Sequence, residues 1–136
     1  MDIEYLDDAK RFLLEEPKKL LKAYGALADK VDASLPRRTV DLENRIQAFK
    51  DLTDYISNHL TDTITEKPNF KFKGTVYANI YVVHFPPYRL LFQVTKTHSR
   101  ALCILATVGD HSNQAIKNLA DLYAADDTDH QSDEEN

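Results

Sequence analysis

The sequence predicts an α+β fold in which an N-terminal helix hairpin packs on one face of an antiparallel β-sheet meander, followed by a short C-terminal helix. Three observations predict it. Apolar residues recur at helical spacing through residues 1–66, and Val, Ile, Tyr and Phe dominate residues 67–109. Helical spacing then returns in residues 110–125. Helices segregated from strands along the chain are typical of this class.

Prolines divide the helical half. The apolar stripes are Tyr5, Ala9, Phe12 and Leu13; then Leu20, Tyr24, Leu27 and Val31; then Leu42, Ile46, Phe49, Leu52 or Thr53, Ile56 and Leu60. Pro17 predicts the start of a new helix, because proline fits best at the first helical position. Leu35-Pro36 is expected to end that helix, and Thr39 or Asp41 to cap the next. The two long stripes would then pack as an antiparallel hairpin.

The second half predicts strands separated by turns. The candidate strands are FKFKGT, VYANIYVVHF, YRLLFQVT and RALCILATV, and the breaks between them are Gly74, Pro86-Pro87 and the polar residues 96–100. This spacing predicts three long antiparallel strands preceded by a short one. A turn at Gly109 and a cap at Ser112 lead to the closing helix, with Ile116, Leu119, Ala120 and Tyr123 as its apolar face. We expect residues 1–125 to form one domain.

Composition limits the classes of protein that fit. The chain has 136 residues, of which 43% are hydrophobic and 29% charged, a balance typical of one globular domain. No apolar run approaches the roughly 20 residues of a transmembrane helix. The acidic N-terminus does not resemble a signal peptide, and one cysteine excludes an intramolecular disulfide. We expect a cytoplasmic protein without cofactor or metal, since no histidine pair has the spacing of metal ligands.

Charge is distributed unevenly. The net charge of −5 comprises −4 in residues 1–66, +6 in residues 67–109 and −7 in residues 110–136. The middle segment contains no Asp or Glu, which predicts a surface that meets a phosphate backbone. The alternative is that a hydrophobic sheet simply contains few acids. The acidic residues 126–136 lack apolar side chains, and we expect them to be disordered.

Alternation within the strand YRLLFQVT assigns side chains to faces. Tyr88, Leu90, Phe92 and Val94 alternate with Arg89, Leu91, Gln93 and Thr95. Lys71 and Lys73 likewise share one face of the preceding short strand. We therefore expect one apolar sheet face and one face with isolated cations.

The run FKFKG, IYVVHFPPYRLLFQV, ALCILATVGDHS and IKNLADLY resembles the C-terminal half of the RelE/ParE toxin superfamily. The resemblance covers roughly residues 70–124. It implies the toxin of a type II toxin–antitoxin pair, with a cognate antitoxin, mRNA and the ribosome as partners. RelE-like members cleave mRNA without a metal: the 2′-hydroxyl attacks the adjacent phosphate and leaves a 2′,3′-cyclic phosphate. That reaction needs a base, an acid and cations around the phosphate.

The resemblance assigns two catalytic candidates. Arg89, in the YR pair, takes the place of the family's catalytic arginine, and a guanidinium grips two phosphate oxygens at once. His111, in GDHS, stands where other members carry a functional His or Arg, and an imidazole can act as acid or base near neutral pH. The structural alternatives are a solvated strand arginine for Arg89 and a turn or cap residue for His111.

The predicted RNA-binding residues are four. Lys71 and Lys73 match the basic pair before the glycine, with ordinary exposed lysines as the alternative. His84 lies near the FPP hairpin end, and Arg100 belongs to the same basic stretch. The tyrosine that several members carry early in the closing helix has no counterpart here.

The function expected from the resemblance is an mRNA interferase acting on ribosome-bound message. Two alternatives remain open. One is a DNA gyrase inhibitor of the ParE branch, which needs no acid or base. The other is a non-catalytic binding or regulatory protein with the same fold, which the acidic total and the missing tyrosine favour.

Overall fold

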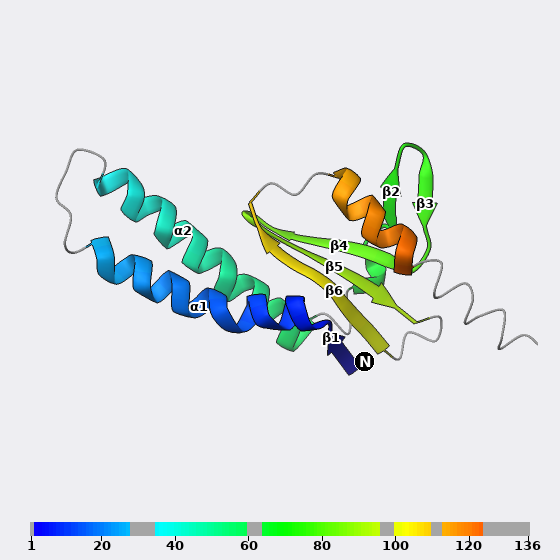
Figure 1. The fold of residues 1–136 in the computed structure, drawn as a ribbon, viewed down its shortest axis with the longest axis horizontal. Coiled ribbons are helices and arrows are strands. Elements are labelled where there is room, and N and C mark those ends of the chain that lie inside the picture. Colours follow the sequence, from blue (N-terminus) through cyan, green and yellow to red (C-terminus); the bar gives the residue numbers. More distant parts are fainter. Residues whose placement is uncertain (1, 28–34, 60–63, 96–99, 110–112, 124–136) are drawn as a thin grey trace, which may run out of the picture.

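The computed structural model describes residues 2–27, 35–59, 64–95, 100–109 and 113–123, and these form an α+β arrangement, as predicted (Figure 1). The elements are β1 Asp2–Tyr5, α1 Asp7–Leu27, α2 Leu35–Asp54, the π-helical η1 Tyr55–His59, the 3-10 turn η2 Ile64–Glu66, β2 Phe70–Phe72, β3 Thr75–Tyr77, β4 Ile80–Phe85, β5 Tyr88–Val94, β6 Arg100–Val108, and a helix over residues 113–123. No helix among the described residues is long and apolar enough to cross a membrane.

The main sheet has the strand order β1-β6-β5-β4. Its β4, β5 and β6 form the predicted antiparallel meander. The prediction that residues 1–66 are entirely helical is wrong at their start, because β1 pairs in parallel with β6 from Asp2 opposite Arg100 to Tyr5 opposite Cys103. The sheet is therefore mixed. Four residues are too few for periodicity to separate a strand from a helix, and the pairing with β6 decides the conformation.

Helix α1 continues through Pro17, so the prediction of a new helix at this proline is wrong. A proline inside a helix removes one backbone hydrogen bond and usually kinks or breaks it. Here buried residues on both sides of the proline, Ala9 and Leu20, anchor α1 in the same core. Packing therefore overrides the local preference.

Helix α2 begins at Leu35, earlier than the predicted cap at Thr39 or Asp41. Pro36 occupies the first turn, where its missing N–H costs nothing. The Thr39 hydroxyl donates to the Leu35 carbonyl at 2.9 Å, a bond within the helix. Leu35-Pro36 thus starts a helix. The predicted end of the preceding helix lies outside the described residues.

The short strand β2 pairs with β3 in a separate two-stranded hairpin. Lys73 and Gly74 form its two-residue turn with φ values of 49° and 85°, the positive pair that tight hairpins require. Lys73 therefore lies in the turn, and the prediction that it shares a strand face with Lys71 is wrong. The candidate strand VYANIYVVHF is split into β3 and β4 at Asn79, whose φ is 66°.

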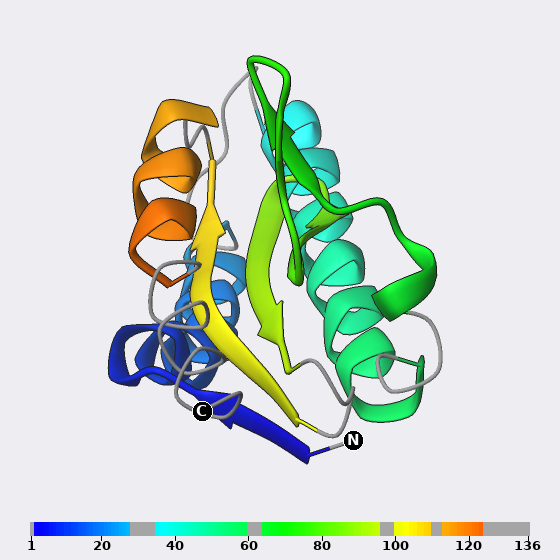
Figure 2. The same cartoon turned by 90° about the vertical axis from the view of Figure 1, so that its right-hand side faces the viewer.

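Both faces of the main sheet are buried, because helices cover each of them (Figure 2). Tyr88, Leu90 and Phe92 of β5 pack under α1 and α2, as expected. The opposite face is not the predicted surface of isolated cations along most of its length. Its core comprises Tyr77, Ile80, Leu91, Ile104, Ile116 and Ala120, with the last two contributed by the helix 113–123.

A buried ionic network joins the helix pair to the first residue of β5. The Glu16 carboxylate is 1% exposed and accepts hydrogen bonds from Arg45 Nη2 at 2.6 Å and Nε at 2.9 Å. It also accepts one from the Tyr88 hydroxyl. Burial and the bond to Glu16 raise the pKa of Tyr88 well above its usual value, so the hydroxyl stays a donor. The network fixes Tyr88 on the face covered by α1 and α2, and Arg89 therefore points to the face covered by the helix 113–123.

Candidate functional site

The β4–β5 hairpin brings His84 and Arg89 together. Phe85 pairs with Tyr88 across the Pro86-Pro87 turn, and the next pair along the ladder is His84 opposite Arg89. Side chains directly opposite in an antiparallel pair share a face, with Cβ atoms about 5 Å apart. Two predicted site residues therefore lie side by side at one end of the sheet.

Two further segments meet Arg89. Thr107 of β6 is its partner on the other side, and this side chain is almost fully buried. Arg89 Nη1 donates to Asn113 Oδ1 at 3.4 Å, a long hydrogen bond. The start of the helix 113–123 therefore lies beside the guanidinium, at the edge of the apolar core under that helix.

The environment of His84 is cationic. Its partial burial and the positive charges of Arg89 and Lys67 lower its pKa below the usual 6.5. The imidazole is consequently neutral at neutral pH and has a ring nitrogen able to accept a proton. His84 remains largely exposed, so a ligand can reach it.

Lys67 is a site residue to which the sequence assigned no role. It follows η2, and its Nζ lies 5.7 Å from the centroid of the Tyr55 ring. The Tyr55 ring packs on Phe85, centroid to centroid at 5.6 Å. This stacking holds Lys67 near the end of β4. Nothing in the spacing of the sequence indicates it, because the contact depends on η1 returning to the sheet.

Arg100, which was also predicted to bind RNA, does not lie beside His84 and Arg89. It opens β6, seven residues before Thr107, which corresponds to about 23 Å along a strand. Its Nη2 forms an exposed ion pair with Glu4 Oε1 of β1 at 2.8 Å. Arg100 thus joins β1 to β6 at the opposite end of the sheet.

Lys71 and Lys73 are exposed on the β2–β3 hairpin. The Tyr77 hydroxyl, at the base of this hairpin, donates to Asp121 Oδ1 at 2.7 Å. Asp121 lies eight residues, about 12 Å of helix, beyond Asn113. The β2–β3 hairpin therefore contacts the C-terminal end of the helix 113–123, whereas Arg89 contacts its N-terminal end. Lys71 and Lys73 are thus basic residues separate from Arg89.

Some predicted features lie outside the described residues. These include His111, the cap at Ser112 and the acidic residues 126–136. Within the described residues there is no group of three or more His, Cys, Asp or Glu side chains placed to hold a metal ion. Cys103 is buried, and this burial raises its pKa to about 12, as befits a core residue.

The chain was compared with family models, with curated proteins and with solved structures, and none of them matches. The resemblance to the RelE/ParE superfamily therefore stays a prediction. What the geometry provides is one neutral imidazole beside a guanidinium and an ammonium. Guanidinium and ammonium groups are chemically suited to bind a phosphate diester, and a neutral imidazole beside them is suited to accept a proton.

Proposed function

We propose that this protein is a RelE-like toxin of a type II toxin–antitoxin system, a metal-independent endoribonuclease that cleaves ribosome-bound mRNA. The observation that carries the proposal is the pairing of His84 with Arg89, with Lys67 close enough to act on the same imidazole. These groups belong to a stretch, residues 67–109, that contains no Asp or Glu. Arg89 and Lys67 bring positive charge to the neutral imidazole, and this charge favours a ligand such as a phosphate diester.

The proposed reaction uses the site as follows. Neutral His84 accepts the proton of the 2′-hydroxyl, whose oxygen then bonds to the adjacent phosphorus. The bond from phosphorus to the 5′-oxygen breaks, which leaves a 2′,3′-cyclic phosphate and a 5′-hydroxyl. Arg89 and Lys67 stabilise the added negative charge on the phosphoryl oxygens in the transition state.

The leaving 5′-oxygen needs a proton donor. The resemblance offers His111 for this role, two residues before Asn113 in the sequence. Lys71 and Lys73, on the separate hairpin, would hold the RNA backbone further from the cleaved bond. A cognate antitoxin would neutralise the protein in the cell.

Inducible expression followed by a cleavage assay tests the proposal. We expect growth arrest with loss of mRNA before loss of DNA synthesis. The purified protein should cut message on ribosomes in the presence of a metal chelator, with 2′,3′-cyclic phosphate ends. His84→Asn should lose cleavage, whereas Lys71→Ala should weaken binding of RNA and leave the chemical step intact. Arrest without RNA cleavage, or cleavage abolished by the chelator, would contradict the proposal.

A second candidate is binding to a polyanion or to gyrase without catalysis, and one observation favours it. At the start of the helix 113–123, where a catalytic tyrosine is expected, stand Ile116, which is buried, and Lys117, which pairs with Asp121 at 2.7 Å. Tyr123 lies at the far end, about 15 Å along the helix from Asn113. Inhibition of gyrase supercoiling by the purified protein, with intact mRNA, would select this alternative.

A further inference from the structure

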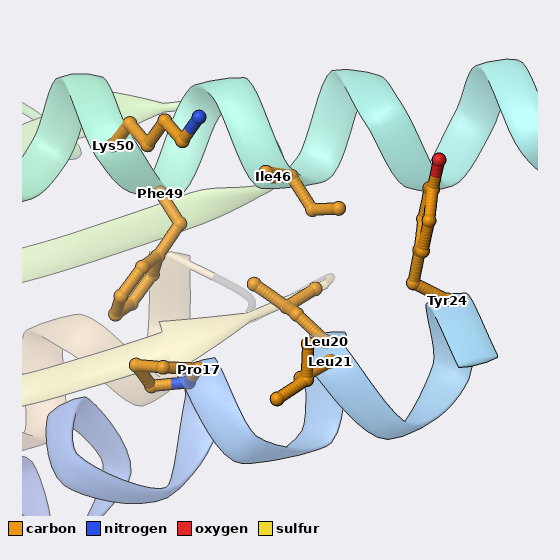
Figure 3. Close-up of a pocket in the computed structure, with 7 residues that line it drawn as sticks. All are labelled: Pro17, Leu20, Leu21, Tyr24, Ile46, Phe49 and Lys50. Atoms are coloured by element: carbon orange, nitrogen blue, oxygen red, sulfur yellow. The ribbon is translucent and has the colours of Figure 1, made fainter.

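A groove with a volume of about 350 Å³ runs between α1 and α2 (Figure 3). Its lining residues are Pro17, Leu20, Leu21, Tyr24, Ile46, Phe49 and Lys50. Lys50 is the single charged member of this set, and it is exposed. The volume is at the lower end of the range for binding pockets in proteins.

Helix α1 carries more apolar surface than its packing on α2 uses. Leu14, Pro17, Leu21 and Tyr24 follow one another at i, i+3, i+7 and i+10, which places them on one side of the helix. Leu14 is 62% exposed, Leu21 75% and Tyr24 52%. The stripe extends for about 15 Å and borders the groove. Contiguous exposed apolar residues are more typical of interaction surfaces than single ones.

The position of the groove leaves it accessible. The two helices extend side by side beyond the end of the sheet, so the sheet does not cover their far halves (Figure 1). Arg89 points to the face of the sheet opposite the helix pair. A ligand in the groove therefore does not cover Arg89, and the inference does not depend on the proposed ribonuclease function.

The charge around the groove is positive on the α1 side. From Pro17 to Leu27 the helix contains Lys18, Lys19 and Lys22 and no acid, and all three lysines are exposed. Lys18 and Lys22 lie on the solvent side of the stripe. The α2 edge is mixed, because Glu43 and Asp54 flank Lys50 there. The lysines on the α1 edge therefore favour a ligand with negative charge.

We propose that this groove docks an amphipathic α-helix of a partner protein. The partner places apolar residues at helical spacing on the stripe and in the groove, and acidic residues against Lys18 and Lys22. A second copy of this chain fits less well, because a symmetric contact between two α1 helices opposes lysine to lysine. An anionic membrane satisfies the charge but leaves the narrow groove between the helices unfilled.

Two synthetic peptides test the proposal, and their binding is measured by fluorescence anisotropy. Both have leucines in the same a/d pattern, but one has Glu and the other Lys at the flanking positions. We expect the Glu peptide to bind about tenfold or more tightly than the Lys peptide, and the difference to shrink as salt rises. The double variant Lys18→Glu/Lys22→Glu should reverse the preference.

Two variants test whether the peptide binds in the groove or to exposed apolar residues elsewhere on the protein. Leu21→Asp should weaken binding of the Glu peptide about tenfold or more, because it removes a central anchor. Leu21 is so exposed that the fold should survive, which circular dichroism checks. The matched control is Leu122→Asp on the helix 113–123, where the leucine is 58% exposed and outside the groove. This control should bind the peptide as the wild type does.

Several outcomes overturn the proposal. Failure of the Glu peptide to bind, or equal binding of both peptides, contradicts an acidic helical ligand. A dimer in sedimentation experiments that Leu21→Asp dissociates assigns the surface to a second copy. Binding to vesicles of anionic lipid that Leu21→Asp abolishes, without selectivity between the peptides, assigns it to a membrane.

Discussion

Arg45 and Arg89 lie on opposite sides of β5 and differ in their surroundings. The Arg45 guanidinium binds the buried Glu16 carboxylate through two nitrogens and contacts the Tyr88 hydroxyl. Arg89 follows Tyr88 directly, but it adds its charge to that of Lys67 around His84 and reaches Asn113 through a long hydrogen bond. The packing of Arg45 indicates a role in stabilising the fold, whereas the function proposed above gives Arg89 a role in binding the phosphate of the RNA.

The largest expected effect is on the structural side of this comparison. Glu16→Ala should lower the free energy of unfolding by about 3–5 kcal/mol, because it leaves the partly buried Arg45 charge and the Tyr88 hydroxyl without their acceptor. Urea denaturation measures it. The matched control is Glu4→Ala, whose partner Arg100 is exposed and which should cost at most about 1 kcal/mol. Equal losses in the two variants would remove the distinction between the buried and the exposed pair.

The second prediction concerns the face on which Arg89 lies. Ile116→Ala should lower the free energy of unfolding by about 2–4 kcal/mol, because this side chain is 1% exposed and fills the core under the helix 113–123. Leu122→Ala, on the same helix but exposed, should change it by less than about 0.5 kcal/mol. If both variants have wild-type midpoints in urea, the helix does not form part of a second core.

The third prediction concerns His84. Its pKa, measured by NMR titration of the imidazole, should lie below 6.5, and Lys67→Ala should raise it because one repelling charge is removed. Since the unfolded state binds the proton more readily, this histidine stabilises the fold above pH 6.5 and loses that contribution as pH falls through its folded pKa. Cleavage should fall over the same acidic range. A pKa unaffected by Lys67→Ala would place the lysine outside the site.

The smallest effect is expected at Arg100. Arg100→Ala should lower the free energy of unfolding by at most about 1 kcal/mol, because both members of its ion pair are exposed. Thermal unfolding at low and high salt measures this, and the difference from the wild type should vanish at high salt. A loss that persists at high salt would show that Arg100 does more than hold β1 to β6 by charge.

Local patterns predicted most of the fold. The stripes of α2 and the alternation in β5 specify buried faces directly, and Phe49, Leu52 and Leu90 are buried as expected. Pairing over long distances was not predictable: β1 is a strand because residues about a hundred positions away supply its partner, β6. Alternation correctly places Leu91 on the same face as Arg89, but it does not show that this face is buried. The helix 113–123 covers Leu91, and this contact was not predicted.

The candidate site was predictable only where it is local. His84 and Arg89 lie on two strands joined by a two-residue turn, so the hairpin pattern already brings them together. Lys67 is placed through Tyr55 and Phe85, contacts between separate elements that no spacing reveals. Arg100 was grouped with the cations by charge, but charge along the sequence does not show to which end of the sheet a residue belongs.

The most direct test of the proposed catalytic role of Arg89 is a single-turnover cleavage assay on ribosome-bound mRNA. The assay compares the wild type with Arg89→Ala and Arg100→Ala. Both variants remove one arginine from the main sheet, and urea midpoints confirm that both are folded. We expect Arg89→Ala to lower the rate constant about 10²–10³-fold, because a donor to the phosphate in the transition state is lost. Arg100→Ala should cleave at the wild-type rate. Wild-type cleavage by a folded Arg89→Ala protein, or equal losses in the two variants, would contradict the assignment.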